Sequence, residues 1–154
     1  LPTKFDTTIP STIEYMEILY NNERVGYIFK QQGSYRYWAK KGVDWKKHLS
    51  KQLVPDNCIY VIDNNTIHVK VVKHQNVAGS VDEKLQTCDF KKKQYIKLFA
   101  ELNYKVEYTY ILSDWFRQDC YKDTRDYIIS VGCSYYYNYI PLHELGLPIP
   151  ERND

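Results

Sequence analysis

The chain has 154 residues, of which 44% are hydrophobic and 26% are charged. This length supports a single domain over residues 1–154, and the composition is globular, which excludes a disordered chain. No apolar run could span a membrane, and the first residues do not resemble a secretion signal, so we expect a cytoplasmic protein.

The formal net charge is only +2, so any anionic partner must bind a local basic patch. The 16 tyrosines accompany many lysines, a combination met on nucleic-acid-binding surfaces, but on composition alone an AT-rich coding bias explains it better. None of the four cysteines lies in a CxxC or CxxH pair, so we expect reduced, mostly packed thiols and no zinc site.

The N-terminal region begins with a predicted helix over residues 11–21. Ser11 and Glu14 have capping-box spacing, and the apolar residues that follow give one face. Residues 25–30 fit either a short strand or a further helix. Residues 33–51 are basic and aromatic, and we expect the part from about residue 43 to be helical.

A β-hairpin is predicted in the middle of the chain. Residues 57–62 and 66–73 are rich in β-branched and aromatic residues, and Asp63-Asn64-Asn65 between them is a good tight-turn sequence.

The C-terminal half alternates helices and strands. Ser80 and Glu83 have capping-box spacing, and an apolar stripe extends the helix that follows to about Leu102. The later predicted elements are a strand over 104–112, a helix over 121–131 closed by Gly132, a strand over 133–137 and a tail over 141–154. This order predicts an α/β fold with a mixed β-sheet flanked by helices.

The segment that carries chemistry begins at Pro55-Asp56 and ends at Lys73. Asp56 lies at the start of one hairpin strand and Lys73 at the end of its partner, so we expect both to share one small site. A carboxylate that holds Mg²⁺ beside a lysine that orients or deprotonates water suits metal-assisted phosphodiester hydrolysis.

These residues resemble the PD-(D/E)xK nuclease superfamily, which has the restriction-endonuclease-like fold. Pro55-Asp56 matches the PD half, Lys73 matches the lysine, and Gln75 matches a glutamine that many members carry. The run 75–87 is similar to that of small type II restriction-type enzymes, and the similarity covers roughly residues 52–140. The resemblance implies a restriction-endonuclease-like core, a Mg²⁺ cofactor, site-specific cleavage of double-stranded DNA and a homodimer.

One position departs from the pattern of this superfamily. The family has Asp or Glu two residues before the lysine, where this chain has Val71, and valine cannot bind a metal. Three explanations stay open. The chain is an inactivated variant, or a naturally inactive relative that binds DNA without cutting it, or Glu83 or Asp82 of the next helix supplies the carboxylate.

The resemblance also implies site residues. The catalytic set is Asp56, Lys73, Gln75, Glu83 and Glu14. The metal set is Asp56, Val72 and Glu83. For nucleic-acid binding we expect Tyr35, Arg36, Lys40, Lys41, Lys46, Lys47, Lys91, Lys92 and Ser80.

Each of these roles has a simpler alternative. Glu83 and Glu14 fit helix capping, Asp56 fits a turn, and the lysines at 91–93 fit a solvated helix face. Two other functions therefore stay open: a non-catalytic DNA-binding or regulatory protein on the same fold, and a protein-interaction module without DNA affinity.

Overall fold

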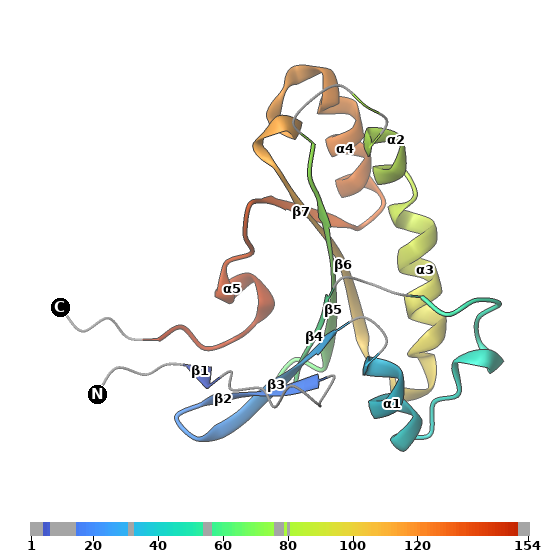
Figure 1. Ribbon diagram of the computed structural model, residues 1–154, viewed down its shortest axis with the longest axis vertical. Coiled ribbons are helices and arrows are strands. Elements are labelled where there is room, and N and C mark those ends of the chain that lie inside the picture. The colour runs from blue at the N-terminus through green and yellow to red at the C-terminus, as the bar shows by residue number, and fades with distance from the viewer. Residues whose placement is uncertain are drawn as a thin grey trace.

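The structure is a computed structural model that describes residues 5–6, 15–30, 33–53, 57–75, 79 and 81–150. Within these residues, seven strands form one open mixed sheet in chain order (Figure 1). The strands are β1 Phe5–Asp6, β2 Tyr15–Tyr20, β3 Glu23–Lys30, β4 Asn57–Val61, β5 Thr66–Lys73, β6 Lys105–Leu112 and β7 Ser134–Tyr137.

The sheet changes from antiparallel to parallel at β5. Strands β1 to β5 are antiparallel neighbours, whereas β5 pairs with β6 and β6 with β7 in parallel. Parallel neighbours need a crossover, which here is helical. Helices α2 (Val81–Leu85) and α3 (Cys88–Leu98) connect β5 to β6, and α4 (Lys122–Ser130) connects β6 to β7. The predicted α/β class with a mixed sheet and helices is therefore confirmed.

The sheet buries a different core on each face. The larger core lies under α1 (Gly33–Lys40), α3 and α4, and the smaller one lies under α5 (Leu142–Leu145) on the other side (Figure 1). Alternation along β5 explains the division, because Ile67 and Val69 enter the larger core while His68 contacts Leu145 of α5.

The predicted central hairpin and the later elements are confirmed with small changes at their ends. Strands β4 and β5 pair over the turn that contains Asn65, whose φ is 52°. Helix α4 ends before Gly132, which has a φ of 78° in the C′ position. The long helix predicted to reach Leu102 is divided into α2, α3 and a final 3-10 turn, Ala100–Leu102. The tail contains the short helix α5.

The helix predicted over residues 11–21 is wrong for its described part, since residues 15–20 form β2. Alternate side chains of β2 pair with β3, as in Met16 with Ile28. Asn21 and Asn22 connect the two strands with φ values of 52° and 66°, the signs of a type I′ hairpin turn. Residues 25–30, which fitted either a short strand or a further helix, belong to strand β3.

The helix predicted from about residue 43 is also misplaced. Helix α1 comes earlier, at Gly33–Lys40, and only a 3-10 turn follows at Trp45–Lys47. Gly42, with a φ of 90°, ends the first helix. The Asp44 carboxylate then accepts a hydrogen bond from the backbone of Lys46 at 3.1 Å and begins the short turn.

Candidate functional site

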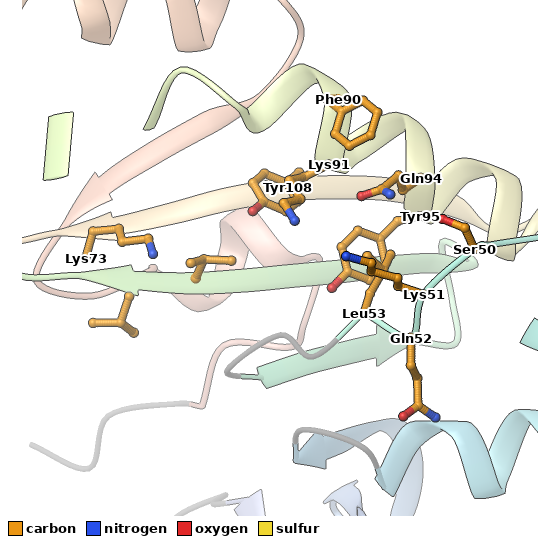
Figure 2. A pocket seen from close by; sticks show the side chains of 12 residues that line it. Ser50, Lys51, Gln52, Leu53, Lys73, Phe90, Lys91, Gln94, Tyr95 and Tyr108 are labelled. Carbon is orange, nitrogen blue, oxygen red and sulfur yellow. The ribbon is translucent and has the colours of Figure 1, made fainter. Parts of the chain in front are cut away.

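A cleft of about 700 Å³ lies where the second half of β5 meets α3 and residues 50–53 (Figure 2). Its lining residues come from four parts of the chain: Ser50, Lys51, Gln52 and Leu53; Val71, Val72 and Lys73; Phe90, Lys91, Gln94 and Tyr95; and Tyr108 of β6. We call it the lysine cleft, for its charged residues.

The charge in the lysine cleft has one sign. Among the described residues that line it, the charged ones are Lys51, Lys73 and Lys91, and none is acidic. Figure 2 shows Lys51 and Lys91 converging beside Tyr95 and Tyr108, with Lys73 farther along β5. Three ammonium groups around one concave surface attract a polyanion, although the net charge of the whole chain is only +2.

Lys73 lies at the carboxyl end of β5, where parallel pairing positions it. It pairs with Leu112 of β6, and its carbonyl accepts a hydrogen bond from the backbone of Ser113 at 3.2 Å. The alternation that buries Val69 places Lys73 on the same face of the sheet, toward α3. Ligand sites of open α/β sheets commonly lie at the carboxyl ends of strands.

One wall of the lysine cleft is held by Tyr35 of α1. The Tyr35 hydroxyl donates to the carbonyl of Leu53 at 2.6 Å and accepts from its N–H at 2.8 Å. Burial raises the pKa of Tyr35 to about 12, so the hydroxyl keeps its proton at neutral pH. The structure thus gives Tyr35, predicted to bind nucleic acid, a role in positioning the segment that carries Lys51.

The opposite wall is one side of α3. Lys91, Gln94 and Tyr95 have the i, i+3, i+4 spacing that places side chains on one helix face. The Gln94 side-chain oxygen is buried and has no hydrogen-bond partner among the described residues, so it is available to a donor in the cleft. Gln94 was not predicted as a site residue, and its helical spacing from Lys91 is the signal that could have identified it. Lys51 lies at the end of the basic and aromatic segment 33–51 but was not singled out within it.

The predicted catalytic residues are only partly described. Asp56 and Glu14 lie outside the described residues, as does Ser80 of the predicted nucleic-acid-binding set. Glu83 is exposed in the first turn of α2 and does not line the lysine cleft. Of the predicted catalytic residues that are described, Lys73 lines the cleft and Glu83 and Gln75 do not.

Gln75 is buried beside the end of β6. Its side chain is 6% exposed, and its amide has no hydrogen-bond partner among the described residues. Its backbone N–H donates to the Ser113 hydroxyl at 3.2 Å, and that hydroxyl lies the same distance from the Gln75 carbonyl. These contacts fix the chain just after β5.

The described residues of the cleft do not fit a magnesium ion. Val72, in the predicted metal set, lines the cleft as a 50% exposed apolar side chain, and Val71 lines it as well. No group of three or more His, Cys, Asp or Glu residues that could hold a metal occurs within the described part of the chain. Magnesium prefers carboxylate oxygens, which these lining residues do not supply.

Most of the other basic residues predicted to bind nucleic acid lie away from the lysine cleft. Five of them are exposed on α1, on the turn that ends it and on the 3-10 turn that follows: Arg36, Lys40, Lys41, Lys46 and Lys47. Lys41 lies over the ring of Tyr37 at 5.6 Å, and Lys46 lies over Trp45 at 6.0 Å.

Lys91 and Lys92 are neighbours with different surroundings. Lys91 lines the cleft, whereas the Lys92 ammonium donates to the carbonyl of Gly132 at 2.6 Å. A cation at the C-terminus of α4 stabilises the carbonyls that the helix leaves unpaired. Lys92 therefore joins α3 to the end of α4.

No protein-family model, curated protein or solved structure matches this chain. Within the described residues, no helix combines the length and apolar character needed to cross a membrane.

Proposed function

We propose that the lysine cleft binds the phosphate backbone of double-stranded DNA, and that the chain is a restriction-endonuclease-like protein whose cleavage activity is limited by Val71. The observation that carries the proposal is the set of three lysines lining one cleft, with no acidic residue among the described lining residues. Phosphate contacts by lysine supply most of the sequence-independent affinity of a DNA-binding protein.

The position of Lys73 supports the restriction-endonuclease-like part of the proposal. Lys73 ends the second strand of a hairpin, and a helical crossover then leads to a parallel strand. This is the place at which the PD-(D/E)xK resemblance puts the lysine. In the proposed complex Lys73 contacts the reacting phosphate and its attacking water, while Lys51 and Lys91 hold neighbouring phosphates.

The resemblance also implies a magnesium ion at this site. Magnesium would neutralise charge on the phosphate, but the described lining residues provide no carboxylate to hold it. We therefore assign no step to the metal in the chain as it stands. A carboxylate at position 71 would lie on the same face of β5 as Lys73, two residues away.

The deciding experiment compares plasmid cleavage by the parent chain, Val71→Glu and Val72→Glu, each with Mg²⁺. Val72→Glu is the matched control because it adds the same carboxylate to a neighbouring cleft residue of β5 whose side chain, unlike that of Val71, alternates away from the face that carries Lys73. We expect Val71→Glu to cut DNA, Val72→Glu not to cut, and Lys73→Ala added to Val71→Glu to abolish cutting.

A second measurement tests DNA binding separately. Binding of a fluorescent duplex by the parent chain should weaken steeply as salt rises. Absence of duplex binding would overturn the whole proposal. We also propose a homodimer on a two-fold symmetric DNA site, which sedimentation of the chain with and without duplex tests.

The second function is a DNA-binding protein without catalytic activity. It is favoured by the apolar pair Val71 and Val72 in the place of metal ligands. Duplex binding that persists while Val71→Glu fails to cut any of several DNAs would support it against the nuclease.

A further inference from the structure

A second cavity, of about 280 Å³, lies on the opposite face of the sheet from the lysine cleft, beside α5. It is lined by Asn64, Thr66, His68, Glu107, Thr109, Ser134, Tyr136, Ile140, Glu144 and Leu145. Figure 1 shows α5 on the side of the sheet away from α3. We call this cavity the α5 pocket.

The floor of the α5 pocket is a sheet face made of polar side chains. Three neighbouring parallel strands each contribute two alternate residues: Thr66 and His68, Glu107 and Thr109, and Ser134 and Tyr136. Thr66, His68 and Thr109 are only 5%, 5% and 4% exposed. The Thr66 hydroxyl donates to the carbonyl of Asn64 and the His68 ring bonds that of Leu145, so part of this polar surface is satisfied within the protein and the rest lines the cavity.

His68 presents an acceptor to the α5 pocket. Its Nε2 lies 3.1 Å from the carbonyl of Leu145, to which it can only donate, so Nδ1 carries no proton in the neutral ring. Burial lowers the pKa of His68 and so favours that neutral form. No hydrogen bond to Nδ1 is formed among the described residues.

The charged groups that line the pocket are carboxylates. Glu107 and Glu144 line it, and among the described lining residues there is no lysine or arginine. Burial raises the pKa of Tyr136, and the nearby Glu144 carboxylate adds to the shift. Lys70 lies on the same face beyond His68 but does not line the pocket. A carboxylate has about four acceptor sites, so Glu144 keeps capacity for another donor.

We propose that the α5 pocket binds a small organic cation through its ammonium group. The three N–H donors of an ammonium match the Glu107 carboxylate, Nδ1 of His68 and the Thr109 hydroxyl. The volume equals that of roughly nine water molecules, enough for an aliphatic amine of a few carbons. This site lies on the other face of the sheet from the lysine cleft and does not depend on the proposed nuclease function.

The test is a titration of the full chain with 1,4-diaminobutane, followed by calorimetry and by backbone amide chemical shifts. The control ligand is 1,4-butanediol, which has the same chain without the charges. We expect saturable binding of the diamine, with shifts concentrated on β5, β6, β7 and α5, and no comparable binding of the diol.

Variants assign the binding to the pocket. Glu107→Gln should weaken diamine binding about tenfold, since it removes a charge-assisted hydrogen bond. Glu144→Gln, on the exposed side of α5, should weaken it several-fold and keeps the test valid if Glu107→Gln does not fold. Glu17→Gln is the control, because Glu17 pairs with Arg24 at 2.8 Å outside the pocket. Equal binding of diamine and diol, absence of saturation, or unchanged affinity in the folded pocket variants would overturn the proposal.

Discussion

The hydroxyl of Tyr35 bonds both backbone groups of Leu53, donating to the carbonyl at 2.6 Å and accepting from the N–H at 2.8 Å. A single side chain on α1 thereby fixes the segment that forms one wall of the lysine cleft. Tyr35→Phe keeps the ring and leaves two partly buried backbone groups unpaired. We expect the free energy of unfolding to fall by about 1–3 kcal/mol, measured by urea denaturation.

The same substitution should weaken duplex binding, because Lys51 lies two residues before Leu53. Tyr139→Phe is the matched control, since Tyr139 is exposed and its hydroxyl has no bond among the described residues. A Tyr35→Phe chain as stable as the parent would contradict the positioning role of this hydroxyl.

Lys51 and Lys91 should each contribute one phosphate contact. Lys51→Ala or Lys91→Ala should lower duplex affinity and reduce the slope of log affinity against log salt by about 0.9. The double variant should reduce the slope by roughly twice as much. Fluorescence anisotropy over a range of salt concentrations measures both quantities.

Lys93→Ala provides the comparison for these two variants. Lys93 lies on the same helix as Lys91, but it is exposed, pairs with Asp89 at 3.0 Å and does not line the cleft. A slope that falls equally in Lys93→Ala would place the DNA on the outer face of α3 and not in the lysine cleft.

Local patterns predicted most of the C-terminal two thirds of the fold, apart from the break between α2 and α3 and the short helix α5. Strands β4 and β5 alternate around an Asp-Asn-Asn turn, and Gly132 marks the end of α4, so local signals and tertiary structure agree. Residues 15–20 fit both the two-residue period of a strand and the 3.6-residue period of a helix, because Met16, Leu19 and Tyr20 also form a helical stripe. Residues 15–20 form a strand because they pair with β3. The pattern within one segment of sequence does not show which other segment it will pair with.

The candidate site could be predicted only in part, at Lys73 and Lys91. Lys73 follows from the motif at the end of the hairpin, but the cleft around it depends on tertiary contacts. Tyr35 reaches Leu53 across 18 residues, and Lys51 meets α3 only after the sheet has formed. Tyr35 and Lys92 were predicted to bind nucleic acid because they are aromatic and basic, but their polar atoms bind backbone groups of the protein.

The turn between β2 and β3 gives a test of the corrected N-terminal region. Asn21 and Asn22 both have positive φ, 52° and 66°, which asparagine tolerates better than other residues with a Cβ. Asn22→Ala should reduce stability by about 1 kcal/mol, whereas Asn22→Gly should be neutral or stabilising. Thermal unfolding distinguishes the two. If residues 15–22 were helical, the order would reverse, because alanine favours a helix and glycine opposes it.

The burial of His68 predicts a dependence of stability on pH. Burial lowers the folded-state pKa of His68 below the unfolded value of about 6.5, outweighing the bond to Leu145 and the nearby Glu107 carboxylate, which raise it. Above about pH 6.5 the ring is neutral in both states and its contribution to stability is fully present. As the pH falls below that value, His68 is protonated in the unfolded chain but stays neutral in the folded chain. Stability is then lost at up to about 1.4 kcal/mol per pH unit, until the folded-state pKa is reached.

His68→Gln isolates this effect from the other titrating groups. The variant should be less stable than the parent at neutral pH, because it loses the bond to Leu145. The difference between the two chains should shrink as the pH falls from about 7 to about 5, since glutamine does not titrate. Urea denaturation at several pH values measures the difference directly. A difference that stays constant over this range would mean that His68 takes up its proton equally in the folded and unfolded chains, and a neutral ring under α5 would then be wrong.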